Sequence, residues 1–193
     1  MKSVSETRKR IRAERRAVDP QIRDLKNSEI CQRFSELDSF ESAEHVAAYL
    51  AFDGEADPME LMISAVDQGK RVYLPVIVGK SKPLAFAPWT PTTTMVKNRF
   101  DILEPDVEQS KWITANELGF VVCPLVGFDE QKNRIGVGGG YYDRTFGFLN
   151  EPGQSKSVQL IGFAFELQRL PSIQPQAWDV GLTAVITESR VYN

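Results

Sequence analysis

The residues best suited to chemistry lie in one glycine-rich loop. Four glycines occupy five consecutive positions, 136–140, with only Val137 between them. Glycine costs up to about 1 kcal/mol relative to alanine in regular structure, so this density favours a place where backbone amides must converge. Consecutive N–H groups with no side chains in front of them form a nest for phosphate oxygens. The loop therefore predicts an anion site, with a phosphate group as its ligand.

Charged residues flank this glycine loop. Arg134 and Arg144 would add positive charge, and a helix starting at Tyr141 would add free N–H groups and its dipole. Asp143 is repulsive beside a phosphate unless a cation lies between them. Mg²⁺ is held in this way, by one or two carboxylates together with phosphate oxygens. The alternative is a flexible loop in which Asp143 is an ordinary helix-start residue.

Two common nucleotide-binding motifs are absent from the chain. The pattern GxxxxGK[ST] fails because Leu74 stands where its first glycine should precede Gly79-Lys80-Ser81. The pattern GxGxxG fails because Tyr141 occupies the position of its last glycine. A nucleotide bound by this chain would therefore be held by a less common loop.

The elements around the loop alternate between strands and helices. A strongly apolar strand is expected at residues 120–125, just before the loop, and a short helix at 141–149, just after it. Further strands are expected at residues 45–51, 71–78, 84–89, 158–165 and 183–187. Helices are expected near the N-terminus, at 20–39 and at 58–69, the last with a capping box from Asp57 and Glu60, whereas 95–105 reads as irregular.

Apolar strands without strict alternation, separated by helices, are typical of a parallel sheet covered on both sides. We expect an α/β fold with a mostly parallel sheet and helices on both faces. Its arrangement should be Rossmann-like and three-layered, with a basic helix at the N-terminus. The length favours a single domain over residues 1–193.

Composition excludes several classes of protein. The 193 residues are 42% hydrophobic and 25% charged, close to the globular average. These values exclude a wholly disordered chain, a collagen and a coiled-coil rod. The longest nearly apolar run, 120–128, is far short of the ~20 residues that cross a bilayer. The charged start argues against a signal peptide. Two cysteines, Cys31 and Cys123, and one histidine make a zinc site or a disulfide scaffold unexpected. We expect a cytoplasmic protein, and a monomer.

Charge is concentrated at the N-terminus. The net charge is −3, but the first 23 residues carry +5 and the remainder −8. A helical register places Val4, Ile11 and Val18 on one stripe that can dock, with Arg8 and Arg15 at its edge. A basic segment on an acidic body suggests an anionic partner, and nucleic acid is not expected because the body is acidic. The alternative is a solvated helix face held by Arg–Glu pairs.

The chain resembles the 5-formyltetrahydrofolate cyclo-ligases, also called methenyltetrahydrofolate synthetases. The most specific match is CPLVGFDEQKNRIGVGGGYYDRTF, residues 123–146. RKRIRAERRAVDP, YLAFDGEAD, GKRVYLPVI, NRFDILEP and WDVGLTAVITESRVY match other family segments in the same order. The resemblance therefore covers nearly the whole chain.

The resemblance implies conversion of 5-formyltetrahydrofolate to 5,10-methenyltetrahydrofolate, with ATP as co-substrate and Mg²⁺ as cofactor. The formyl oxygen would be phosphorylated, and N10 of the folate would attack the formyl carbon, releasing ADP and phosphate. Such a reaction needs positioning and charge stabilisation rather than a nucleophilic side chain. A reduced-folate-binding protein without turnover is the alternative.

The resemblance also implies roles for individual residues. The ATP phosphates would be held by Arg8, Arg134, Ile135, Gly136, Val137, Gly138, Gly139, Gly140, Tyr141 and Tyr142. The folate would contact Leu50, Glu55, Phe100 and Tyr142, and Mg²⁺ would be held by Asp143 and Asp179. Core packing is an equal alternative for Phe100. No residue is expected to act through a covalent step.

Three positions depart from the family pattern. Val4 stands where many members have a lysine, for which Lys2 or Lys9 would have to substitute. Val137 replaces a basic residue in the loop, and Thr183 replaces a second metal-binding aspartate. These departures leave fewer basic and metal-binding side chains around the triphosphate than the family pattern implies.

Overall fold

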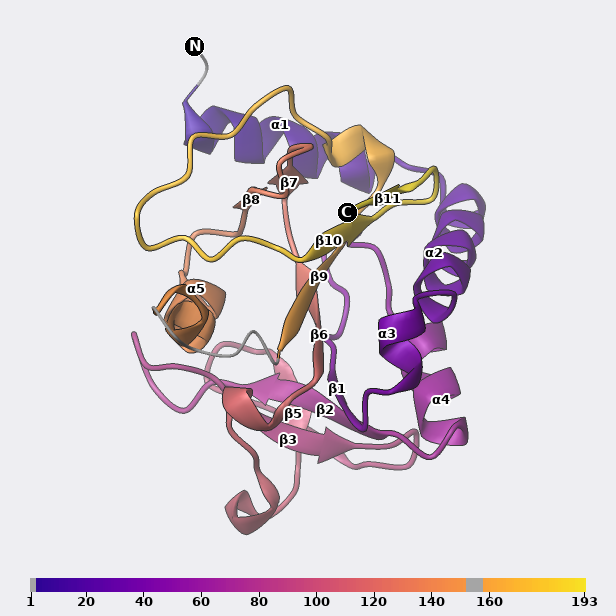
Figure 1. Cartoon of the computed structure of the whole chain (residues 1–193), viewed down its shortest axis with the longest axis vertical. Coiled ribbons are helices and arrows are strands. Elements are labelled where there is room, and N and C mark those ends of the chain that lie inside the picture. The colour runs from indigo at the N-terminus through magenta and orange to yellow at the C-terminus, as the bar shows by residue number, and fades with distance from the viewer. Residues whose placement is uncertain (1–2, 152–157) are drawn as a thin grey trace.

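A seven-stranded sheet forms the centre of the computed structural model, which describes residues 3–151 and 158–193. Its order is β11-β10-β9-β6-β1-β2-β3 (Figure 1). Five strands are parallel: β1 (His45–Ala47), β2 (Arg71–Val76), β6 (Phe120–Pro124), β9 (Gln159–Phe163) and β10 (Ala184–Ile186). The edge strands β3 (Ala85–Trp89) and β11 (Val191–Tyr192) are antiparallel to their neighbours. The prediction of a mostly parallel sheet is confirmed.

Successive side chains of the strands enter two separate apolar clusters. In β6, Phe120 and Val122 join one cluster, whereas Val121 and Cys123 join the other. The first cluster also contains residues of α2 (Pro20–Ser35), α3 (Asp38–Glu41) and α4 (Met59–Asp67). The second contains Phe146 of α5 (Tyr141–Phe146), which lies across the sheet from α2 and α4 (Figure 1).

The direction of the chain reverses between β1 and β6. From β1 the chain goes to β2 on one side, and from β6 it goes to β9 and β10 on the other. The loops after β1 and β6 therefore leave the same edge of the sheet and diverge there. In open α/β sheets, ligands bind outside the carboxyl ends of the strands at such a point. This topology places the segment 48–58 beside the segment that leads to the glycine loop.

Helix α1 (Val4–Arg16) packs beside the hairpin of β7 (Gly127–Phe128) and β8 (Arg134–Ile135), at the top of Figure 1. A capping box between Ser3 and Glu6 starts the helix. Of the expected apolar stripe, only Ile11 is fully buried, against Val126 and Ile135. Val4 is 52% exposed, so the stripe docks at its centre rather than along its length.

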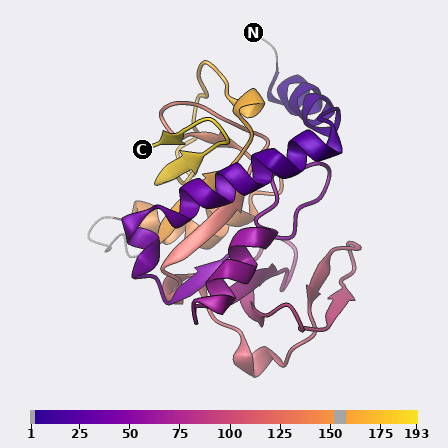
Figure 2. The ribbon, with the colours of Figure 1, turned by 90° about the vertical axis from the view of Figure 1, so that its right-hand side faces the viewer.

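Three expectations about local structure were wrong. Residues 95–105 are not irregular but form the hairpin of β4 (Met95–Lys97) and β5 (Leu103–Pro105), the pink arrows that project from the body in Figure 2. The first strand ends at Ala47, because the segment after it turns away as a loop. Helix α4 has no capping box, since Pro58 is its N-cap and Asp57 accepts a hydrogen bond from the Met59 N–H instead.

The remaining elements are short 3₁₀ helices: η1 (Gln109–Lys111), η2 (Ala115–Glu117), η3 (Gly147–Asn150) and η4 (Glu166–Gln168). η3 continues α5, so together they cover the helix expected at 141–149. Within residues 3–151 and 158–193, no helix has both the length and the hydropathy that crossing a bilayer requires.

Candidate functional site

The glycine loop joins β8 to α5 and depends on glycine at two positions. Gly138 has φ +108° and Gly140 has φ +61°, a conformation that residues with a Cβ rarely adopt. Gly140 is also the N-cap of α5. Residues 136 and 138–140 are at least partly exposed, so their backbone is open to a ligand.

Arg8 reaches this loop from α1. Its Nε donates a hydrogen bond to the Gly136 carbonyl at 2.8 Å, and its guanidinium carbon lies 3.8 Å from where a Cβ on Gly138 would be. The fold therefore brings the first helix and the glycine loop together, 128 residues apart in sequence. Lys9 is exposed on α1, and Lys2 lies outside the described residues.

Asp143 lies in the first turn of α5 and is paired with Arg134. Its Oδ1 accepts a hydrogen bond from Arg134 Nη2 at 2.6 Å and another from the Val180 N–H at 3.2 Å. Arg134 also donates to the Val180 carbonyl. The Arg134 side chain is 6% exposed and that of Asp143 is 26% exposed. The pair joins the glycine loop to the segment before β10.

The donors around Asp143 fit Mg²⁺ only as a single-carboxylate site. Asp143 is partly exposed, and its Oδ2 has no hydrogen bond within the described part of the chain. Asp179 uses its Oδ2 to accept the Gln176 N–H at 2.9 Å, which closes its own turn. Among the described residues, no three acidic, histidine or cysteine side chains gather as a metal centre. Mg²⁺ commonly binds one carboxylate together with phosphate oxygens and water, so one carboxylate suffices.

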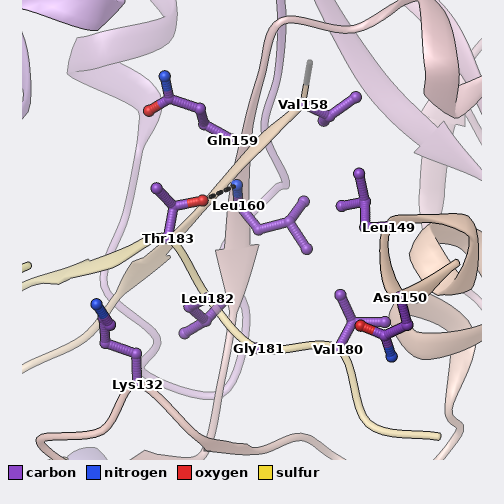
Figure 3. Close-up of a pocket in the computed structure, with 10 residues that line it drawn as sticks. All are labelled: Lys132, Leu149, Asn150, Val158, Gln159, Leu160, Val180, Gly181, Leu182 and Thr183. Atoms are coloured by element: carbon purple, nitrogen blue, oxygen red, sulfur yellow. Dashed lines mark hydrogen bonds between the residues drawn. The ribbon is translucent and has the colours of Figure 1, made fainter. Parts of the chain in front are cut away.

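A cavity of about 460 Å³ adjoins this pair (Figure 3). Its wall includes Val180, whose backbone also bonds Arg134 and Asp143. Polar side chains on the wall come from Lys132, Asn150, Gln159 and Thr183. Thr183 Oγ1 accepts the Leu160 N–H at 3.2 Å, the dashed line in Figure 3. Thr183 therefore uses its side chain to bind the backbone of β9.

Glu55 lies buried in the loop after β1, with 4% of its surface exposed. Its Oε1 lies 3.7 Å from Arg15 Nη1, and its Oε2 accepts the Phe52 N–H at 3.3 Å. Burial raises the pKa of this carboxyl to about 7, although the Arg15 guanidinium and the hydrogen bond oppose the rise. Glu55 therefore changes charge near neutral pH.

Tyr142 and Glu55 are close enough to influence each other. Burial raises the pKa of the Tyr142 hydroxyl, and the Cys123 thiol and the Glu55 carboxylate raise it further. The structure thus brings together the loop after β1 and the first turn of α5. Leu50, partly buried against the first cluster, lies on the same loop as Glu55.

The structure does not bring Phe100 to Glu55, Leu50 and Tyr142. It lies at the tip of the β4–β5 hairpin, 49% exposed, with the Arg99 guanidinium 4.7 Å from its ring centre. Within the described chain, no hydrogen bond, ion pair or ring contact joins it to Glu55 or to the glycine loop. Its exposure argues against the alternative of core packing.

Sequence reasoning gave no role to the cluster that holds the Glu55 loop. Asp53 accepts from Arg12 Nε at 2.6 Å and from Arg16 Nη1 at 3.1 Å, and Arg15 lies beneath it without exposed surface. The available signal was the spacing of Arg8, Arg12 and Arg15, which puts three cations on one face of α1.

We expect Glu55 to make the fold less stable as the pH rises. Its pKa is about 7 in the folded chain and near 4.5 in the unfolded chain, so the folded state binds the proton more tightly. The resulting stabilisation is lost between these values and amounts to about 3 kcal/mol. Between about pH 5 and pH 8, the free energy of unfolding measured with urea should decline less for Glu55→Gln than for wild type. An equal decline of this free energy in the two proteins would show that Glu55 is not a buried group that ionises in this pH range.

Comparisons with known proteins agree with one another. Residues 1–188 match the model of the 5-formyltetrahydrofolate cyclo-ligase family. A 5-formyltetrahydrofolate cyclo-ligase of Escherichia coli strain K12 is 35% identical over 183 residues, covering 94% of this chain and 98% of that protein. A protein of the same name from Haemophilus influenzae is 34% identical over 187 residues, with the same two coverages.

Solved structures share the fold. The 5,10-methenyltetrahydrofolate synthetase of Aquifex aeolicus superimposes with a TM-score of 0.80 at 25% identity, covering 97% of this chain and 91% of that one. That of Mycoplasma pneumoniae gives 0.74 at 20% identity, covering 97% and 99%. With a family match over almost all its length, the chain belongs to the 5-formyltetrahydrofolate cyclo-ligase family.

Proposed function

We propose that this chain is an ATP-dependent ligase that converts 5-formyltetrahydrofolate to 5,10-methenyltetrahydrofolate, with release of ADP and phosphate. The observation that carries the proposal is the convergence of Arg8, the glycine loop and the Glu55 loop at the strand edge where the chain direction reverses. Family membership supports the same reaction. An anion site and a buried hydrogen-bond acceptor are the two features that a triphosphate and a pterin need.

The glycine loop and Arg8 bind the ATP phosphates in this proposal. Gly138 and Gly140 keep the loop backbone free of side chains where the phosphates approach. Arg134, Ile135, Tyr141 and Tyr142 complete the loop on its two sides.

Asp143 would hold Mg²⁺ with help from phosphate oxygens, and Asp179 is the second candidate on the neighbouring segment. The ion, when bound, neutralises charge on the phosphate oxygens. Arg134 would stay beside Asp143 and the phosphates, because its other hydrogen bond is to the Val180 carbonyl.

Glu55 accepts hydrogen bonds from the N–H groups of the pterin, with Leu50 and Tyr142 beside the ring. Phe100 contacts the folate only if the β4–β5 hairpin bends towards the strand edge. The protein positions N10 of the folate near the formyl carbon while the formyl oxygen takes the γ-phosphoryl group. N10 then attacks this carbon, phosphate leaves with the oxygen, and the N10 proton is released.

The cysteines do not supply a nucleophile. Burial raises the pKa of both Cys31 and Cys123 to about 12, so neither thiol ionises near neutral pH. This fits a reaction that proceeds by positioning and charge stabilisation.

The finer features of the fold belong to the same proposal. We propose a Rossmann-like three-layer domain over residues 1–193, with the basic α1 serving the nucleotide site. We also propose that the protein acts in the cytoplasm, as a monomer, on small-molecule substrates and not on nucleic acid.

A direct assay tests the reaction. Protein, Mg²⁺, ATP and 5-formyltetrahydrofolate are mixed, and the absorbance of the methenyl product is followed. We expect product and ADP in equal amounts, and none without ATP. Folate binding by calorimetry without ADP release would instead support a reduced-folate-binding protein, the alternative suggested by Val4, Val137 and Thr183.

A further inference from the structure

Arg15 is an arginine with no exposed surface, located in the last turn of α1. Its Nε and Nη2 both donate to the Asp53 carbonyl, at 3.2 and 3.1 Å. Its Nη1 donates to the Leu125 carbonyl at 3.3 Å. One side chain therefore joins α1 to the loop after β1 and to the segment after β6.

Burying a guanidinium is costly, and burial lowers the pKa of Arg15. The carboxylates of Glu55 and Asp53 oppose this effect, since Nη1 lies 3.7 Å from Glu55 Oε1 and Nη2 lies 3.4 Å from Asp53 Oδ2. The loop adopts left-handed backbone at Asp53, with φ +53°, and at Gly54, with φ +72°. These two residues fold the loop over the end of α1, so that Glu55 faces Arg15.

Arg12 and Arg16 hold the same loop from outside. Among the described residues, both side chains bind only the Asp53 carboxylate, and that of Arg16 is 55% exposed. Arg15 differs from them because it alone forms an ion pair with Glu55 among the described residues. Replacing Arg16 therefore removes a contact that anchors the loop, whereas replacing Arg15 also removes the ion pair with Glu55.

We propose that Arg15 is a positioning residue for folate, which keeps the Glu55 carboxylate charged and aimed at the substrate from beneath. This inference rests on the proposed function, in which Glu55 accepts the N–H groups of the pterin. Arg15 touches neither folate nor nucleotide and acts only through Glu55 and its loop. The same helix carries Arg8, so α1 contributes to both halves of the site.

The charge of Glu55 is set by few neighbours. The groups that face it are Arg12 and Arg15 on α1, Asp53 on its own loop, Tyr49 after β1 and Tyr142 on α5. Arg15 has the largest effect among these groups and lowers the Glu55 pKa. Without the guanidinium the carboxyl would gain its proton at a higher pH, so folate capture would need a more alkaline solution.

The test compares the pH profile of kcat/KM for 5-formyltetrahydrofolate in wild type and Arg15→Met. In wild type, kcat/KM should rise with pH through the Glu55 titration. In Arg15→Met the midpoint should move up by about one pH unit or more. Activity at neutral pH should fall about five-fold and recover in alkaline solution. The KM for ATP should change little.

Arg16→Met is the matched control, since it removes a cation from Asp53 but none from Glu55. The midpoint of its kcat/KM pH profile should equal that of wild type. In the double variant Arg15→Met/Glu55→Gln, kcat/KM should equal that of Glu55→Gln alone, because Arg15 acts through Glu55. An unchanged midpoint in Arg15→Met, or an additive loss in the double variant, overturns the inference.

Two further outcomes are distinguishable. If Arg15→Met does not fold, Arg15→Lys carries the test: it keeps the charge but not the fork that spans Asp53 and Leu125. It should keep the wild-type midpoint with a lower kcat/KM for folate, and an unchanged kcat/KM overturns the inference. Absence of ATP-dependent product with wild type would instead refute the proposed function.

Discussion

Replacing Asp143 by asparagine should lower kcat/KM for Mg-ATP by about 100-fold or more, the scale seen when one preorganised electrostatic group is removed from an active site. The change keeps the shape of the side chain but removes its charge. The amide then neither attracts Mg²⁺ nor balances Arg134. Folate binding, measured by calorimetry without nucleotide, should be unchanged because Glu55 and Leu50 lie on another loop and asparagine keeps the shape of the turn that carries Tyr142.

The stability of the variant must be measured alongside its activity. Arg134 is 6% exposed and loses its carboxylate partner, so the free energy of unfolding should also fall. A native far-UV spectrum and cooperative unfolding would show that the activity loss is local. Asp67→Asn, at the exposed end of α4, is the matched control and should behave as wild type. Near-normal Mg-ATP kinetics in a folded Asp143→Asn would remove this residue from the proposed metal site.

Elements with a strong local signal could be predicted from the sequence. The apolar run of β6 and the glycines after it signal a buried strand and a turn that only glycine allows. The β7–β8 hairpin, which was not predicted, separates the two, so the sequence alone does not place the loop relative to the sheet. Asp19 and Pro20 likewise begin α2 as expected, with Asp19 accepting from the Gln21 N–H.

The parts that could not be predicted depend on distant partners. The β4–β5 hairpin has few buried residues, and Glu104 fixes it by accepting from the Ile77 N–H at 2.8 Å, 27 residues away. Arg15 looks like any other charge of a basic helix. Its burial follows only from the meeting of two distant segments over α1, the loop that carries Asp53 and Glu55 and the segment that carries Leu125.

Gly138→Ala should also abolish most ATP use, for a reason of backbone geometry. At φ +108° an alanine is strained by about 1–3 kcal/mol, so the loop would rotate its amides out of the nest. The new Cβ would also lie 3.8 Å from the Arg8 guanidinium carbon, in the space open to phosphate. We expect a loss of about 100-fold in kcat/KM for ATP, comparable to removal of one oxyanion donor.

The control is Gly147→Ala, at the other end of α5. Gly147 has φ −55°, and a Cβ there would meet no atom within 4 Å, so alanine should be accepted without loss. Binding of ADP to each variant, measured by calorimetry, separates the two expectations: Gly138→Ala should bind more weakly and Gly147→Ala as wild type. If Gly138→Ala kept wild-type affinity for ADP, the phosphates would have to lie away from this turn, and Arg8 would lose its role with them.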